Sequence, residues 1–152
     1  MGIFDESGQI SFDRNGNLPT GVHEITMGDI VQHFAWTTKR KKLIAGLKSA
    51  LENMQKAGVK KVWIDGSFVQ NKDEPDDIDG CREAHPNIDV SLLDSVFLDI
   101  NPPREGMKMK YGVDFLISNV PFRDTKGENS TPDVFFQTDR QGNKKGIFLI
   151  FL

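Results

Sequence analysis

The sequence is poor in cysteine, in long apolar runs and in excess positive charge, and each shortage excludes a class of protein. Cys81 is the single cysteine, so neither an intramolecular disulfide framework nor a four-cysteine zinc site can form. The longest apolar run, residues 147–152, is far shorter than a membrane span. Nineteen Lys and Arg against 22 Asp and Glu give a net charge of −3, which excludes an overall basic nucleic-acid binder but not a local basic patch.

The single cysteine and the N-terminal residues indicate the cellular compartment. A lone cysteine is typical of a reducing compartment, and the first residues lack the positive charge and apolar core of a signal peptide. We therefore expect a soluble, cytoplasmic protein with no membrane partner and no disulfide-linked partner.

Length and local composition predict one folded domain with a short extension. A chain of 152 residues with 38% apolar and 27% charged residues has the size and composition of one globular domain. Residues 1–21 are rich in Gly, Asn and Asp and predict an N-terminal arm or hairpin with a turn at Asn15-Gly16. Residues 22–152 then form the domain.

Two helices follow this segment. Thr26 and Asp29 have the spacing of a capping box, which predicts a short helix towards Phe34. From Lys39 to Ala57, apolar residues recur every three or four positions, and Gly58 is placed to end the helix. The predicted buried stripe consists of Leu43, Ile44, Leu47, Ala50, Leu51 and Met54.

The rest of the chain predicts mainly strands. Strands are expected at 60–65, from Asp77 onwards, at 111–117 and after a turn at 141–143, whereas the periodicity of 91–100 is ambiguous. Pro102-Pro103 are expected to start a short helix that carries Arg104, Lys108 and Lys110, because proline suits a first helical turn. The order of elements predicts a single mixed α/β domain.

A knot of acidic residues is the main chemical feature. Five of the seven residues from Asp73 to Asp79 are acidic. On a strand, Asp77 and Asp79 would project to the same side, and a hard cation such as Mg²⁺ would relieve their repulsion. The other three acids of the knot, Asp73, Glu74 and Asp76, are interpreted as loop charges.

Two further motifs complete a predicted phosphoryl-transfer site. Gly66-Ser67 closes a strand, where glycine lets the backbone approach a phosphate and serine can donate to it. Asp114 is flanked by Val113 and Phe115 on a later strand and supplies a third carboxylate. Three carboxylates, two metal ions and a triphosphate would form a two-metal site.

These motifs, in this order, resemble the core of the polymerase-β-like nucleotidyltransferase superfamily, most closely its small minimal members from prokaryotes. Residues 18–24, 62–68, 135–140 and 145–147 are similar to a bacterial branch of that superfamily. The resemblance implies a mixed β-sheet with helices packed on one side. It also implies transfer of NMP from an NTP, with ATP expected, to a hydroxyl of a protein, RNA or small-molecule acceptor.

Site roles follow from the resemblance. Asp77 and Asp79 would bind two Mg²⁺ ions when nucleotide is present, and Asp114 would bind one ion and help to deprotonate the attacking hydroxyl. Gly66 and Ser67 would bind the terminal phosphates. Independently of the resemblance, Lys108 and Lys110 precede the strand of Asp114, so both are candidate nucleotide-binding residues and one of them is expected to reach a phosphate.

The sequence departs from the superfamily pattern in two places. Gly80 stands where an apolar strand residue is usual, which predicts a short or bulged strand after Asp79. The sequence also lacks the C-terminal helical domain with which larger relatives hold base or acceptor. A partner would supply those contacts, or the protein is inactive.

Other interpretations remain open. A nucleotidyltransferase-like fold could act as a binding module, in the manner of an antitoxin or a regulatory partner. The run from Lys39 to Lys42, together with Lys48, Lys60 and Lys61, could form a basic surface for RNA. Zinc is not expected at Cys81 and His85 because no second ligand pair follows. His23 is expected to have a structural role, Trp36 and Trp63 to pack in the core or stack on bases, and Phe135-Phe136 to pack in the core.

Overall fold

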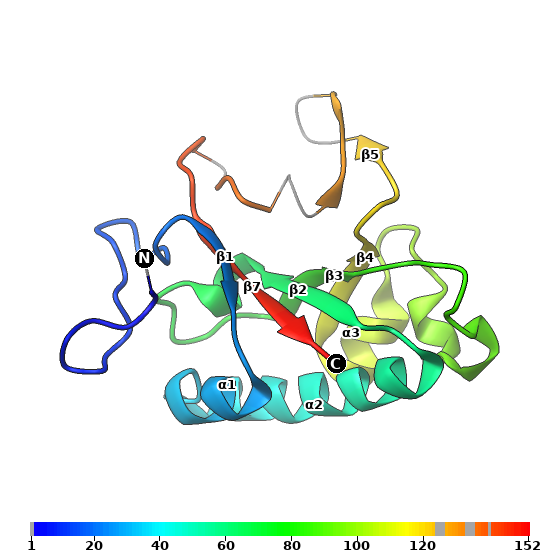
Figure 1. Cartoon of the computed structure of the whole chain (residues 1–152), viewed down its shortest axis with the longest axis horizontal. Coiled ribbons are helices and arrows are strands. Elements are labelled where there is room, and N and C mark those ends of the chain that lie inside the picture. The colour runs from blue at the N-terminus through cyan, green and yellow to red at the C-terminus, as the bar shows by residue number, and fades with distance from the viewer. Residues whose placement is uncertain (1, 124–126, 133–135, 140) are drawn as a thin grey trace.

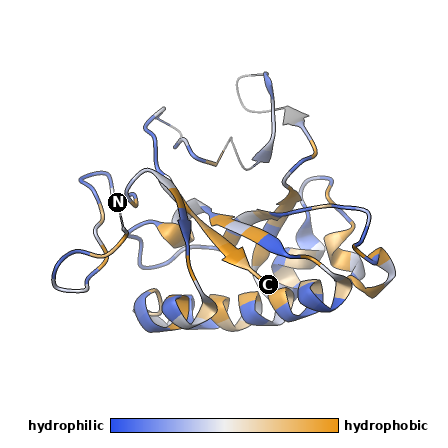
Figure 2. Cartoon of the chain, in the orientation of Figure 1, coloured by the Kyte–Doolittle hydropathy of each residue, from blue (hydrophilic) through white to orange (hydrophobic). Residues whose placement is uncertain are grey.

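Helix α2 (Thr38–Ala57) is a 20-residue helix of the computed structural model, and its buried residues form part of the core. The Thr37 hydroxyl accepts from the backbone amide of Arg40 at its start, and Gly58 ends it in the left-handed region at φ 98°. Every residue of the predicted stripe is buried, so the predicted helix and its apolar face are confirmed. Figure 2 shows apolar residues of α2 on the side facing the sheet.

The two shorter helices differ in how well their sequences predict them. Helix α1 (Met27–His33) begins with the capping box formed by Thr26 and Asp29, as predicted. Helix α3 (Glu105–Tyr111) begins later than predicted, and the expectation that it carries Arg104 is wrong. Arg104 precedes the helix with φ 51°, a left-handed backbone that an α-helix cannot contain.

Five strands form an open mixed sheet in the order β1-β7-β2-β3-β4 (Figure 1). The outer pairs β1–β7 and β3–β4 are parallel, while β7–β2 and β2–β3 are antiparallel. The strands span Gly21–Glu24 (β1), Lys61–Asp65 (β2), Ile78–Arg82 (β3), Val113–Ile117 (β4) and Gly146–Phe151 (β7). Strands β5 (Phe122–Arg123) and β6 (Asn129–Ser130) form a small separate hairpin.

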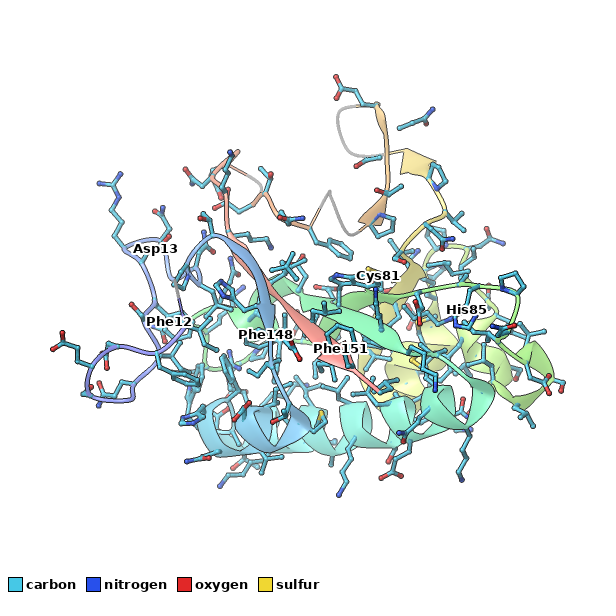
Figure 3. The ribbon with its side chains drawn as sticks, viewed as in Figure 1. Phe12, Asp13, Cys81, His85, Phe148 and Phe151 are labelled. Atoms are coloured by element: carbon cyan, nitrogen blue, oxygen red, sulfur yellow. The ribbon has the colours of Figure 1, made fainter. Side chains whose placement is uncertain are left out.

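Helices α1, α2 and α3 lie on one side of this sheet, and the segment that carries β5 lies on the other (Figure 1). The structure describes residues 2–123, 127–132, 136–139 and 141–152. In the core, Phe148 of β7 (labelled in Figure 3) packs edge-on against Phe34, which ends α1, with ring centroids 4.9 Å apart. The predicted single domain of mixed α/β structure is thereby confirmed.

Strand β3 is regular at Gly80, so the predicted shortening or bulge is wrong. Gly80 pairs with Ile64 of β2 and Phe115 of β4 without a break in register. A Cβ atom at Gly80 would lie 2.2 Å from the carbonyl oxygen of Trp63 and 2.8 Å from the Phe115 ring. The glycine is therefore explained by close packing against both neighbours, and the strand continues through it.

The N-terminal residues are packed onto the domain. Phe4 and Ile10 form an isolated antiparallel bridge, and a turn at 13–17 precedes Leu18. Ile3 and Leu18 are both buried in the main core. This segment thus contributes apolar contacts to the fold before β1 begins.

Two short 3₁₀ turns, η2 (Val90–Leu92) and η3 (Ser95–Phe97), overlap residues 91–100, which explains the ambiguous periodicity of that segment. In the part of the chain that the structure describes, no helix has the length and apolar character needed to cross a membrane.

Candidate metal centre

Three carboxylates meet at one end of the sheet. Asp77 immediately precedes β3, Asp79 lies within it, and Asp114 is the residue of β4 that pairs with Asp79 in the parallel register. One carboxylate oxygen from each residue lies within 4.8 Å of the other two. The β3–β4 pairing therefore brings together carboxylates that are distant in the sequence.

Strand alternation explains why these carboxylates avoid the core. Val113 and Phe115 are buried on the helix-covered side of β4, so Asp114 between them projects to the opposite face. Ile78 is likewise buried between Asp77 and Asp79. The cluster consequently forms on the sheet face away from α2.

The glycine of the Gly66-Ser67 motif is in direct contact with this cluster. Gly66 follows β2 and begins a short 3₁₀ turn, η1 (Gly66–Val69), with φ 77°. A Cβ atom at Gly66 would lie 2.1 Å from the Oδ2 atom of Asp79, so only glycine leaves room for that carboxylate. Ser67 comes next in the same turn, and the motif therefore borders the acidic cluster.

The cluster has an unfavourable excess of negative charge. Burial raises the pKa of Asp79 to about 7, and the charges of Asp77 and Asp114 act in the same direction. Burial also raises the pKa of Asp77, with the Asp114 charge as the next cause. Near neutral pH the metal-free protein thus holds Asp79 partly protonated, and a cation would favour its ionised form.

Two cations from the α3 region already contact Asp114. The Arg104 guanidinium places Nε 2.5 Å from Oδ1 and Nη2 3.4 Å from Oδ2 of Asp114, and Lys108 Nζ lies 3.7 Å from Oδ2. Lys110 instead forms an ion pair with Asp94, because residues two apart on a helix face different sides. Of the two lysines predicted to bind phosphate, the structure brings only Lys108 to the cluster.

A buried ion pair beside the cluster was not predicted from the sequence. Lys145 Nζ lies 2.8 Å from Asp65 Oδ1, and both side chains are buried. Asp65 pairs with Asp79 across β2–β3, and burial raises the pKa of Asp65 while Lys145 opposes that shift. The position of Asp65, a charged residue at the end of an apolar strand, could have indicated a functional or ion-paired group. Nothing in the local sequence identifies Lys145 as its partner.

The donor set suits a hard divalent cation. All three ligand atoms are carboxylate oxygens, which Mg²⁺ and Ca²⁺ prefer. Oxygen ligands about 2.1 Å from Mg²⁺ are separated by at most about 4.2 Å. The three carboxylate oxygens lie within 4.8 Å of one another, slightly beyond that spacing, so Asp77, Asp79 and Asp114 have the ligand type and approximate arrangement that would hold Mg²⁺.

Residues 10–150 match a family of unknown function, DUF6932. The chain belongs to this family. No curated protein and no solved structure matches the chain. The family match spans every residue of the acidic cluster and each cation that contacts it.

Arg40 corrects the interpretation of the basic run as one surface. Its side chain is fully buried, stacks 3.6 Å from the centre of the Trp36 ring, and has a pKa lowered by burial to about 10. The Trp36 indole donates to Asp73, so Asp73 anchors the loop rather than serving only as a solvated charge. The Arg40 guanidinium donates to the carbonyl oxygens of Phe34, Ser67, Phe68, Gln70 and Lys72.

The other residues singled out in the sequence lie in hydrogen-bonded or packed positions outside the acidic cluster. The His23 ring lies 2.6 Å from the carbonyl oxygen of Pro19, which confirms its hydrogen-bonding role. Cys81 is buried in β3, and His85 lies in the following loop with its Nε2 atom 3.6 Å from Glu83 (Figure 3). Phe136 is half-buried, while Phe135 lies outside the described residues.

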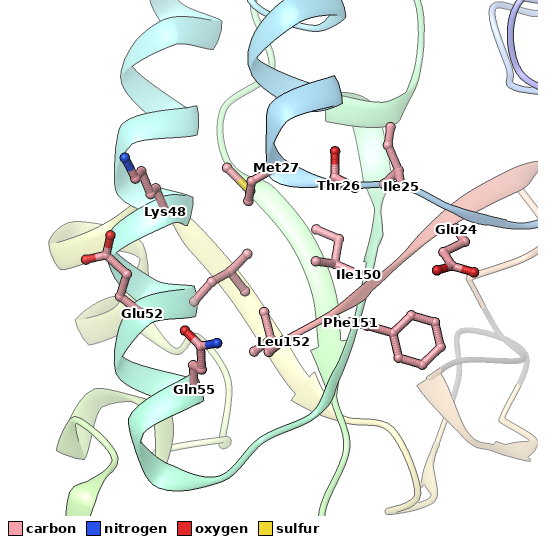
Figure 4. Close-up of a pocket in the computed structure, with 11 residues that line it drawn as sticks. Glu24, Ile25, Thr26, Met27, Lys48, Glu52, Gln55, Ile150, Phe151 and Leu152 are labelled. Atoms are coloured by element: carbon pink, nitrogen blue, oxygen red, sulfur yellow. The ribbon is translucent and has the colours of Figure 1, made fainter.

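Two cavities lie at opposite ends of the sheet. One of about 320 Å³ lies between the C-terminal end of β7 and helix α2 (Figure 4), and none of the three clustered carboxylates lines it. The other, of about 400 Å³, lies at the start of β1 and β7, at the same end as the cluster. It is lined by Thr20, Gly21, Gln137, Thr138, Lys144 and Lys145.

Proposed function

We propose that the protein is a Mg²⁺-dependent nucleotidyltransferase that transfers NMP from an NTP to a hydroxyl group. The observation that carries this proposal is the convergence of Asp77, Asp79 and Asp114 within 4.8 Å, with Gly66 against Asp79. In a solvated acidic loop, charge repulsion would disfavour a third carboxylate from a distant strand beside Asp77 and Asp79. A bound cation would offset that repulsion. The motif resemblance adds the nucleotide to this metal chemistry.

In this reaction the acceptor oxygen forms a bond to the α-phosphorus, and the bond from that phosphorus to the bridging oxygen of the β-phosphate breaks. Pyrophosphate leaves with the bonding electron pair, and the hydroxyl proton passes to a carboxylate or to water. The bound metal ions would neutralise triphosphate charge and favour ionisation of the hydroxyl. The protein's own contribution is to fix these groups in a preorganised site.

Each residue has a defined part in the proposal. Asp77 and Asp79 would hold the metal ions, while Asp114 would hold one ion and accept the proton. The backbone at Gly66 leaves room for phosphate, and the Ser67 hydroxyl donates to it. Lys108, beside Asp114, supports the charge of the leaving group, and Lys110 is left out because Asp94 binds it.

Transfer is tested with purified protein and each of the four NTPs labelled at the α-phosphate. RNA, protein and small alcohols serve as candidate acceptors. We expect Mg²⁺-dependent pyrophosphate release and label transfer, reduced by orders of magnitude in Asp79→Ala because a metal ligand is lost. Equal turnover by the wild-type protein and Asp79→Ala would refute the proposal.

A binding module is the second candidate, and the Arg104–Asp114 ion pair favours it. A carboxylate already neutralised by a guanidinium has less need of metal. This alternative predicts that Asp77→Ala and Asp79→Ala keep the cellular phenotype of the wild-type gene. Loss of that phenotype in folded variants would discard it.

A further inference from the structure

The contact between Arg104 and Asp114 places two cations in competition for one carboxylate. A carboxylate offers about four lone-pair positions. Arg104 occupies one on each oxygen, and Lys108 approaches Oδ2 as well. A metal ion that binds Asp114 would therefore lie beside a guanidinium of the same charge sign, and their repulsion would weaken metal binding.

The backbone of Arg104 indicates that this contact is specifically held. Among the described residues, Arg104 is the one non-glycine residue with a positive φ, 51°. That conformation costs about 1–2 kcal/mol for an L-residue other than glycine. Arg104 also donates from Nη1 to the carbonyl oxygen of Ile100. Its guanidinium contacts thus offset a backbone penalty that glycine or asparagine would largely avoid.

A triphosphate can remove the competition. The planar guanidinium fork fits phosphate oxygens as well as it fits a carboxylate. Arg104 and Lys108 lie on the same carboxylate, so an anion that enters with the metal finds both cations at the cluster.

We propose that Arg104 is an internal counter-ion that makes metal binding at the Asp77–Asp79–Asp114 cluster dependent on a nucleoside triphosphate. Without nucleotide, Arg104 holds Asp114 and disfavours the metal. With nucleotide, Arg104 transfers to a phosphate oxygen and frees Asp114. This inference rests on the proposed function and identifies Arg104 as a nucleotide-binding residue that couples the two ligands.

The coupling is measured by titrating Mn²⁺ into the full chain, with and without saturating α,β-methylene ATP. Mn²⁺ binding is followed by its electron paramagnetic resonance signal. The variant is Arg104→Asn, since asparagine tolerates the left-handed backbone and carries no charge. Lys110→Gln is the matched control, because it removes a cation from the same region that binds Asp94 instead. Cooperative urea unfolding verifies that each variant is folded.

We expect nucleotide to increase the Mn²⁺ affinity of the wild-type protein about fivefold or more, within the usual range of coupling between sites. Arg104→Asn should bind Mn²⁺ alone more tightly than wild type and lose most of the coupling. Lys110→Gln should behave as wild type.

Three results would overturn the inference. If Arg104→Asn keeps the wild-type coupling while Asp79→Asn abolishes Mn²⁺ binding, the metal site stands and the role of Arg104 is rejected. If Lys110→Gln reproduces the effect of Arg104→Asn, general charge explains it and the inference again fails. If neither wild type nor Arg104→Asn binds Mn²⁺ or the nucleotide, the proposed function itself fails, and the inference fails with it.

Discussion

Asp79→Asn should stabilise the metal-free protein, and the gain should grow with pH. The pKa of Asp79 is about 7 in the folded protein against 3.8 for an ordinary aspartate. A carboxyl group with a raised folded pKa lowers stability as pH rises from the unfolded to the folded pKa, because the unfolded state ionises first. Asparagine cannot ionise and escapes this cost.

The magnitude follows from the two pKa values. Each pH unit between them corresponds to about 1.4 kcal/mol. At pH 8 the full difference of about 3 units between the folded and unfolded pKa of Asp79 applies, so its ionisation lowers the free energy of unfolding by about 4 kcal/mol. At pH 5 only about 1 unit of ionisation in the unfolded state contributes, or about 1.5 kcal/mol. Asp79→Asn should therefore gain about 2–3 kcal/mol more at pH 8 than at pH 5.

Urea unfolding in EDTA at both pH values measures this difference. Asp76→Asn is the matched control, since Asp76 is an exposed acid of the same loop and its change should stay within about 0.5 kcal/mol. An Asp79→Asn change that is destabilising, or equal at both pH values, would refute the argument that repulsion and burial disfavour the Asp79 charge.

Three further substitutions test the surroundings of the cluster. Asp114→Asn should destabilise the metal-free protein by about 1–3 kcal/mol in urea unfolding, the opposite sign to Asp79→Asn, because two cations lose their partner. Gly66→Ala should cost at least about 1 kcal/mol more than Gly142→Ala, since both glycines have positive φ but only the first lacks space for Cβ; equal costs would contradict the close contact. Arg40→Met should reduce the free energy of unfolding by about 3 kcal/mol or more through unpaired carbonyl groups, against less than about 0.5 kcal/mol for exposed Lys41→Met.

Local signals in the sequence predicted helices α1 and α2 well. The capping box at Thr26 and Asp29 and the left-handed Gly58 each act within a few residues, so their effect is visible in the sequence alone. The predicted start of α3 was wrong because Arg104 adopts a left-handed backbone conformation, which arginine does not favour. The contacts that hold it there come from Asp114 and Ile100 and exist only in the folded chain.

In the candidate site, too, the features set by local sequence were predicted and those set by tertiary packing were not. Strand alternation correctly predicted that Asp77 and Asp79 face the same side, and Asp114, expected as a third carboxylate from a later strand, lies beside them. The partners of these acids could not be predicted, because Arg104 and Lys145 reach their carboxylates through tertiary packing.

Arg40 shows a further limit of sequence reasoning. In the sequence it is one of four adjacent basic residues, and its neighbour Lys41 is indeed exposed. Its burial depends on carbonyl groups of the distant 67–72 segment, which converge on one guanidinium. A helix position that faces the core can therefore hold a charge when enough acceptors surround it.

The most direct test of the central claim is calorimetric titration of the folded protein with α,β-methylene ATP, in Mg²⁺ and then in EDTA. The nucleotidyltransferase account predicts binding in Mg²⁺ that is lost in EDTA and in Asp79→Asn. A wild-type protein that unfolds cooperatively yet binds no nucleotide in Mg²⁺, or binds equally well in EDTA, would contradict it.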